Sequence, residues 1–147
     1  MSVVSYKDGV LASDSRLMSD VILSDKTRKI FENQGMLLGV SGEWDKCVKG
    51  ISWFKDGADL SDIPEEDFQG LLVIPTFPKE KIYLIGFGYA LEIDEPFFSI
   101  GSGSSVALGA MYAGASAPGS VLAAIKFQNG CGGEVQKLYL KRRESND

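Results

Sequence analysis

The chain has 147 residues, of which 44% are hydrophobic and 24% are charged, and its formal net charge is −5. This length supports one buried core and is too short for two comfortable domains, so we expect a single domain over residues 1–147. Acidic and basic residues are interspersed over most of the chain, apart from an acidic stretch at residues 59–67 and a basic cluster of Lys137, Lys141, Arg142 and Arg143. We assign the basic cluster to a solvated strand end and tail, so we expect no nucleic-acid-binding surface.

The first part of the chain is typical of two β-hairpins. Lys7-Asp8-Gly9 and Asn33-Gln34-Gly35 are turn sequences, because Asp, Asn and Gly tolerate the backbone conformations that tight turns need. Each turn is flanked by two short apolar runs: residues 3–6, 10–13, 28–31 and 36–40. A polar connection rich in Ser and Asp separates the hairpins, so four strands are expected before any helix.

A helix is expected next, from Glu43 to Lys55. Its apolar residues recur at helical spacing and form one stripe: Trp44, Cys47, Val48, Ile51 and Phe54. The acidic segment 59–68 contains Pro64 and is expected to be a surface loop. Cys47 lies on the buried stripe, which favours a reduced thiol that fills the core, and Cys131 is likewise assigned to packing.

The second part of the chain mixes strands with two further helices. Three strands are expected at residues 71–74, 81–85 and 89–93, and a last one at residues 135–140. The first of these helices carries Val106, Ala107, Ala110 and Met111. The second begins at the N-cap Ser116 and buries Val121, Leu122 and Ile125. Strands and helices come in blocks, which predicts an α+β fold with two antiparallel sheets and helices outside them.

The composition also bears on the cellular location of the protein and on its need for a metal ion or cofactor. No apolar run approaches the ~20 residues of a membrane span, and the N-terminus lacks the pattern of a signal peptide. With two cysteines and no leader, we expect a cytoplasmic protein that contacts no membrane. The chain has no histidine and no paired-cysteine motif, so we expect no zinc site and no cofactor.

The absence of histidine makes Ser2 the most informative residue. A hydroxyl nucleophile needs a proton acceptor near neutral pH, and a Ser-His-Asp triad is excluded. A free α-amino group has an ordinary pKa of about 8 and can take up this proton. A small second residue generally permits removal of Met1, so Ser2 is expected to supply both nucleophile and base.

Five short motifs occur in an order that resembles a known family. They are Ser2-Val3-Val4, residues 9–14 (GVLASD), Arg28-Lys29-Ile30, residues 39–42 (GVSG), and residues 100–103 (IGSG) followed by Ala107-Leu108. From Ser2 to about Leu140 the chain resembles the proteasome β-subunits, and especially the bacterial HslV-type peptidases. These proteins are N-terminal nucleophile hydrolases, so the resemblance implies a four-layer αββα sandwich of two antiparallel sheets flanked by helices.

The resemblance also implies a set of site residues. Ser2 stands where the family usually has a catalytic threonine, Asp14 matches the aspartate that orients the amine, and Lys29 matches the lysine whose charge favours loss of the hydroxyl proton. Ser102 matches the serine that bonds to the terminal amine. We add the backbone N–H of Gly42 as an oxyanion donor, because a residue without a side chain lets a carbonyl group approach closely.

The chain also departs from the family. An aspartate and a serine that support the amine in the family have no clean counterpart around residues 129–134. The region between the first helix and Leu71 is compressed, and in the family the helices there make ring contacts and, in HslV, dock an unfoldase.

The expected function is cleavage of peptide or unfolded-protein substrates through an acyl-enzyme on Ser2, in a homo-oligomer. Whether the oligomer is a ring, and whether it recruits an ATPase unfoldase, is left open by the compressed region. Two alternatives also stay open, namely a catalytically silent scaffold or assembly subunit of the same fold, and an amidase or acylase acting on a small molecule.

Overall fold

Strands outnumber helices in the computed structural model, which describes residues 2–141. The strands are β1 (Val4–Lys7), β2 (Val10–Ser13), β3 (Leu17–Met18), β4 (Ile22–Ser24), β5 (Ile30–Asn33), β6 (Met36–Gly42), β7 (Phe68–Ile74), β8 (Lys81–Gly86), β9 (Tyr89–Ile93), β10 (Phe97–Ile100) and β11 (Gln136–Tyr139). The helices are α1 (Trp44–Lys55), α2 (Ser104–Tyr112) and α3 (Ala117–Phe127). The described residues therefore have the mixed α+β composition that the sequence predicts.

Both predicted hairpins are confirmed, and left-handed turn residues explain them. Asp8 and Gly9 have φ angles of +50° and +80° between β1 and β2, and Gln34 and Gly35 have φ angles of +53° and +82° between β5 and β6. Two consecutive positive φ angles match the right-handed twist of the paired strands. The turn residues thus favour the pairing of β1 with β2 and of β5 with β6.

The strands form two main antiparallel sheets and one small hairpin. The first sheet has the order β10-β1-β2-β11, and the second has the order β5-β6-β7-β8-β9. Strands β3 and β4 pair only with each other. In the first sheet, β1 lies between β10 and β2, so its backbone is paired on both edges.

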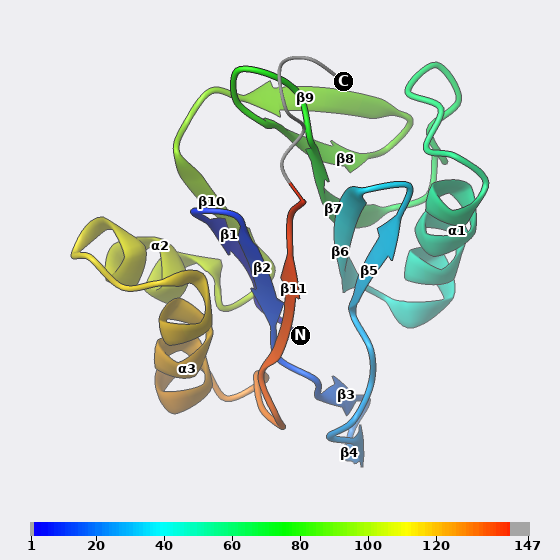
Figure 1. Ribbon diagram of the computed structural model, residues 1–147. Helices are drawn as coiled ribbons and strands as arrows, with labels where there is room; N and C mark the ends of the chain where they lie inside the picture. The colour runs from blue at the N-terminus through cyan, green and yellow to red at the C-terminus, as the bar shows by residue number, and fades with distance from the viewer. Residues whose placement is uncertain (1, 142–147) are drawn as a thin grey trace.

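The helices contact opposite sheets. Helices α2 and α3 pack against β1, β2 and β10 of the first sheet, whereas α1 packs against β5, β6 and β7 of the second (Figure 1). Strands β1 and β2 also contact β5 and β6. The part of the chain that the structure describes contains no helix long and apolar enough to cross a membrane.

A core of hydrophobic side chains, all but one of them aliphatic, joins the two sheets. It comprises buried residues from both: Val4, Tyr6, Leu11, Ile30, Leu37, Leu71, Val73, Ile82 and Ile100. Gly39 on β6 allows this close approach, because a Cβ atom there would lie 2.3 Å from Cγ1 of Val4 on β1. Each fully buried aliphatic side chain in this core contributes about 1.5–3 kcal/mol.

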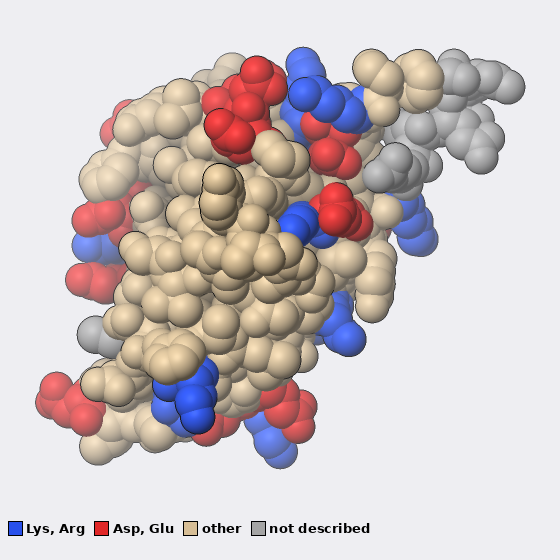
Figure 2. Space-filling model, turned by 90° about the vertical axis from the view of Figure 1, so that its left-hand side faces the viewer, with Lys and Arg blue, Asp and Glu red and all other residues tan. Residues whose placement is uncertain are grey.

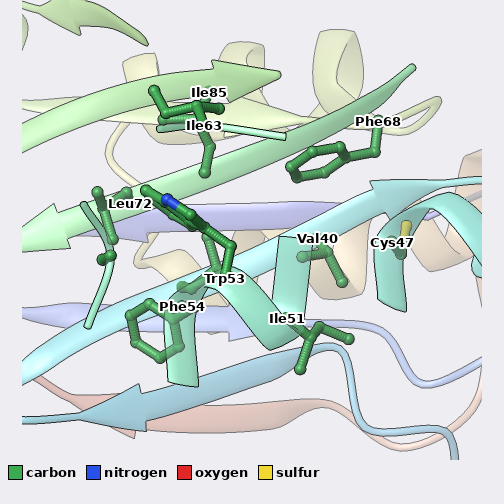
Figure 3. Close-up of a cluster of buried hydrophobic side chains, with 11 residues drawn as sticks. Val40, Cys47, Ile51, Trp53, Phe54, Ile63, Phe68, Leu72 and Ile85 are labelled. Atoms are coloured by element: carbon green, nitrogen blue, oxygen red, sulfur yellow. The ribbon is translucent and has the colours of Figure 1, made fainter. Parts of the chain in front are cut away.

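A second core lies between α1 and the second sheet (Figure 3). Trp53 and Phe54 pack there against Leu72, and the Trp53 indole donates to the carbonyl oxygen of Asp59 at 2.8 Å. Gly50 leaves room for the Phe68 ring, which would lie 2.4 Å from a Cβ at that position. The helix thus packs along β6 and β7 of the second sheet.

Helices α2 and α3 are capped by specific contacts. Ser116 is the N-cap of α3, as predicted, and its hydroxyl accepts the Gly119 N–H at 3.1 Å. Lys7 on β1 donates from Nζ to the carbonyl oxygens of Met111 and Ala115, at 3.1 and 2.9 Å. A cation at the C-terminal end of α2 stabilises its unpaired carbonyl groups.

Some sequence predictions are wrong in detail. The polar connection after β2 contains the β3–β4 hairpin, and β10 is a strand that the pattern did not reveal. Val48 and Leu122 were expected to be buried, but they are 47% and 58% exposed. Trp53 and Ala124 are buried on these helices instead, because each helix is rotated slightly from the orientation that its apolar stripe suggests.

Candidate active site

The ends of four strands converge around Ser2. Ser2 precedes β1, Asp14 follows β2, Lys29 precedes β5, and β6 ends at Ser41 and Gly42. The hairpin pairing of β1 with β2 places Val4 opposite Ser13, so the residues just beyond this pair lie side by side. The close packing of β1 on β6 then brings the second sheet to the same point.

Asp14 lies at the centre of this cluster and is fully buried. Its Oδ1 accepts the Lys29 ammonium at 2.9 Å and the Val3 N–H at 3.2 Å. Its Oδ2 accepts the N–H of Gly132 at 3.1 Å. Three donors, one of them charged, compensate the removal of this carboxylate from water. The carboxylate therefore fixes the positions of β1, Lys29 and the turn before β11.

Lys29 is held at both its backbone and its side chain. Its N–H donates to Oε1 of Gln136 at 3.2 Å, and its carbonyl oxygen accepts the Val40 N–H at 3.0 Å. Its side chain is 4% exposed and forms a buried ion pair with Asp14. A buried lysine at the end of a cleft places a fixed positive charge in a low-dielectric environment, where it acts strongly on any developing negative charge.

Ser2 is fixed by contacts of its backbone and of its hydroxyl. Its carbonyl oxygen accepts the N–H of Gly103 at 3.1 Å, and its Oγ donates to Oγ of Ser41 at 2.5 Å. Gly101, whose φ is +97°, leaves room for this carbonyl group, because a Cβ there would lie 2.3 Å from it. Ser2 is 3% exposed as a residue, yet it lines a cleft.

Ser102 and Gly42, the two remaining predicted residues, also lie near Ser2. The Ser102 hydroxyl donates to the carbonyl oxygen of Ser2, at 3.4 Å. This distance is long for a hydroxyl donor, so the contact is weak. Gly42 is the exposed last residue of β6, with φ at +133°, and it lines the same cleft.

The cleft has a volume of about 480 Å³. Ser2, Lys29 and Gly42 lie on it, and the side chains of Leu17, Met18 and Leu23 from the β3–β4 segment form its apolar wall. A larger hollow of about 670 Å³ lies between the β7–β8 and β9–β10 connections, but none of the five predicted site residues lines it. We assign the site to the smaller cleft, because the buried ion pair and the serine hydroxyl are there.

Arg16 supports the wall of the cleft. Its guanidinium binds both carboxylate oxygens of Asp25, at 2.7 and 3.1 Å. This pairing lowers the pKa of the Asp25 carboxyl and raises the pKa of Arg16. The guanidinium also lies against Gly132, where a Cβ would be 2.3 Å from Cζ. Arg16 thus connects the β3–β4 segment to the turn that holds Asp14.

The two cysteines are buried near the site, and burial disfavours the ionised form of both thiols. Cys47 lines the cleft, and burial raises the pKa of its thiol to about 11. Burial also raises the pKa of Cys131, and the nearby Asp14 carboxylate adds to this shift. Thiols with raised pKa values carry little thiolate near neutral pH and are poor nucleophiles. The serine is therefore the better nucleophile candidate in the cleft.

Sequence reasoning missed three residues that shape the site. Ser41 contacts the Ser2 hydroxyl, Gly132 donates its backbone N–H to Asp14, and Arg16 packs on Gly132. Gly132 lies in the segment 129–134, which has no clean counterpart of the family's supporting aspartate and serine, and it provides a main-chain donor instead. The Gly132-Gly133 pair signals such a close backbone approach, and it is the one clue that the sequence offered.

The arrangement therefore joins a hydroxyl, a buried lysine and a buried carboxylate at the end of a cleft. Within residues 2–141, no group of three His, Cys, Asp or Glu side chains is placed to hold a metal ion. The expected removal of Met1 concerns a residue outside the described range. A comparison of the chain with models of known protein families gives no match, and a comparison with curated proteins gives none either.

Proposed function

We propose that the protein is an N-terminal nucleophile hydrolase of the proteasome and HslV type, which cleaves peptide bonds through an acyl-enzyme on Ser2. The observation that carries the proposal is the buried Lys29–Asp14 pair, whose Nζ and Oδ1 atoms are 2.9 Å apart beside the Ser2 residue that lines the cleft. The activity requires processing that exposes the α-amino group of Ser2, because a peptide nitrogen cannot act as a base.

The fold supports this proposal. Two antiparallel sheets face each other, with α2 and α3 contacting the first sheet and α1 the second (Figure 1). We interpret this arrangement as the αββα sandwich of N-terminal nucleophile hydrolases. In that interpretation the nucleophile precedes a strand that is paired on both edges, as Ser2 precedes β1 here.

The proposed reaction begins with proton transfer from the Ser2 hydroxyl to the Ser2 amine. The Oγ atom then attacks the substrate carbonyl carbon, and the carbonyl oxygen becomes an oxyanion. Collapse of this intermediate breaks the C–N bond, and the leaving amine takes the proton from the Ser2 ammonium. A water molecule then attacks the ester carbonyl, with the amine as its base, and restores the hydroxyl.

Lys29 and Gly42 have separate roles in this mechanism. The Lys29 ammonium stabilises the serine oxygen as it loses its proton, and it disfavours a second positive charge on the nearby amine. Asp14 compensates the lysine charge and holds β1 through the Val3 N–H. Gly42 lines the cleft at the end of β6, where its N–H is our candidate donor to the oxyanion. Ser102 supports the Ser2 backbone.

We further propose that the protein assembles with copies of itself through α2 and α3. The sequence has no charged residue between Glu95 and Lys126, and the centre of the α2–α3 side carries none among the described residues (Figure 2). Tyr112 and Leu122 are 87% and 58% exposed there. Copies with a net charge of −5 repel each other over most of their surface, so an uncharged apolar face favours self-contact.

The remaining parts of the proposal concern substrate and partners. The apolar wall formed by Leu17, Met18 and Leu23 suits an extended peptide or an unfolded protein with an apolar side chain. We propose a cytoplasmic location and, as a further partner, an ATPase unfoldase that would supply unfolded chains.

The test of the proposal is a mass measurement with a peptide epoxyketone. The Ser2 hydroxyl adds to its ketone carbon and the Ser2 amine opens its epoxide, so the adduct contains the whole probe. The protein should be released from a cleavable fusion that leaves Ser2 as the first residue, and compared with a form that retains Met1. We expect one adduct on the first form, and none on the second or on Ser2→Ala.

The outcomes separate the proposal from its alternatives. No adduct on the form that begins with Ser2 would contradict the proposal and favour a silent scaffold subunit. An adduct together with hydrolysis of small acyl amides, but not of peptides, would favour an amidase or acylase. Ser5→Ala is the matched control, because Ser5 is a buried serine on β1 whose hydroxyl pairs with Ser99 away from the cleft.

A further inference from the structure

The hydroxyl groups of Ser2 and Ser41 make the shortest side-chain contact of the site. Their Oγ atoms are 2.5 Å apart, and the residues are 3% and 7% exposed. The contact joins the two sheets, because Ser2 precedes β1 of the first and Ser41 is on β6 of the second. Ser41 has no role in the proposed reaction, so its contact with the Ser2 nucleophile needs an explanation.

A serine nucleophile needs such a contact more than a threonine does. The second substituent on the Cβ atom of threonine restricts χ1, whereas a serine hydroxyl can occupy three staggered positions. A hydrogen bond to Ser41 selects the position in which the Ser2 Oγ faces β6. This is also the side of Gly42, the residue that follows Ser41 on the strand and lines the cleft.

Ser41 is itself well placed to hold this bond. It pairs with Gln69 in the β6–β7 ladder, one position before the last pair, so its backbone is held by the second sheet. A Cβ atom at Gly101 would lie 3.0 Å from its Oγ, so the absence of a side chain at Gly101 leaves space for the hydroxyl. The backbone carbonyl of Ser2 and the hydroxyl of Ser41 thus both depend on the same glycine.

We propose that Ser41 is a positioning residue, which holds the Ser2 hydroxyl in the reactive rotamer and replaces the restriction that a threonine methyl group would impose. The inference rests on the proposed function of Ser2. In the resting state the Ser41 oxygen accepts a hydrogen bond from the Ser2 hydroxyl. When that proton moves to the amine, the Ser41 hydroxyl turns its own hydrogen towards the Ser2 oxygen, since a hydroxyl both donates and accepts.

The test compares Ser41→Ala in two backgrounds, the natural Ser2 and Ser2→Thr. All forms begin at residue 2, and the epoxyketone reaction gives kinact and KI for each. With Ser2, we expect Ser41→Ala to lower kinact by about three- to tenfold, the effect of one hydrogen bond, with KI unchanged. In the Ser2→Thr background the same substitution should lower kinact by less than about twofold, because the methyl group already restricts χ1.

Two controls keep the result specific. Ser5→Ala removes one partner of another buried Ser–Ser contact, 3.0 Å between Oγ atoms, and should leave kinact unchanged. Unfolding midpoints of all forms identify any loss that comes from stability alone. An equal loss of kinact in both backgrounds, or no loss with Ser2, would overturn the role of Ser41 and leave Ser2 as the nucleophile. No reaction in the unsubstituted form would overturn both proposals.

Discussion

The buried Lys29–Asp14 pair makes a quantitative prediction about stability. Lys29→Met removes the charged donor and leaves the Asp14 carboxylate, which is fully buried, with two backbone donors from Val3 and Gly132. Asp14→Asn instead leaves the Lys29 ammonium without its carboxylate partner. Breaking a buried ion pair from one side generally destabilises a protein by about 3–5 kcal/mol. Because the Asp14 carboxylate keeps two donors, we expect the loss of stability of Lys29→Met to be near the lower limit of this range, at about 3 kcal/mol.

The double variant Asp14→Asn/Lys29→Met should behave differently from the sum of its parts. It removes both charges together, so no uncompensated ion stays in the core, and neutral replacement of a buried pair is often tolerated. We expect it to lose no more stability than either single variant, which is strong non-additivity for residues in contact. All three variants should lose the reaction of Ser2, because the lysine charge is absent or misplaced in each.

Urea unfolding followed by tryptophan fluorescence measures these changes, since Trp53 is packed in the core beneath α1. A loss of about 3 kcal/mol lowers the urea midpoint by more than about 1 M and the melting temperature by roughly 6–12 °C in a protein of this size. Single variants within about 0.5 kcal/mol of the unsubstituted protein would refute the reasoning. So would a double variant whose loss equals the sum of the single losses.

Three further predictions follow from other parts of the structure. Gly101→Ala should destabilise the protein more than Gly114→Ala, because both residues have positive φ but only a Cβ at Gly101 meets the Ser2 carbonyl. The unfolding midpoints of the two variants compare their stabilities, and equal decreases would contradict the clash. Cys47 should resist a thiol reagent at pH 8 until urea unfolds the protein, because its pKa of about 11 leaves about one thiolate in a thousand. The folded state keeps this proton, so stability should fall as pH rises from 9 towards 11. Tyr112→Glu should shift the mass from light scattering towards the monomer, while Val48→Glu, at an exposed position of α1, should not.

The sequence was most informative where backbone conformation selects the residue type. Gly9 and Gly35 have left-handed conformations that few other residue types adopt, so both hairpins could be predicted. The Ser116 cap of α3 was predictable for the same reason, because a side-chain acceptor at that position has a direct structural role. These signals are local, and they do not depend on the packing of the rest of the molecule.

The sequence was least informative where tertiary packing determines which strands pair and which side of a helix is buried. The β3–β4 hairpin has only two and three residues per strand, which is too short for an alternating pattern. On α1 and α3, an apolar stripe limits the buried face to a range of orientations, and the sheet beneath selects one of them. Val48 and Leu122 therefore face outward although they lie beside buried residues.

The candidate site likewise contains residues that the sequence reveals and residues that only the packing of the strands brings into it. Ser2, Asp14 and Lys29 were predicted because each is a reactive side chain in a recognisable motif; the structure pairs Lys29 with Asp14 and places Ser2 and Lys29 on the same cleft. Ser41 was missed because its contact with Ser2 exists only when β6 meets β1. The donor at Gly132 was missed because a main-chain N–H is present at almost every residue and leaves no mark in the sequence.

The position of β1 has a consequence for how the molecule moves. Terminal segments of proteins usually open first, and their amides exchange rapidly with solvent. Here Val3 packs among the side chains of α2 and α3, while Val4 packs between the sheets and the strand is paired on both edges. The amides of β1 should therefore exchange only through global unfolding, which makes this strand one of the last to open. Ser2 is anchored to a rigid element, so no ordering entropy need be lost there when a substrate arrives.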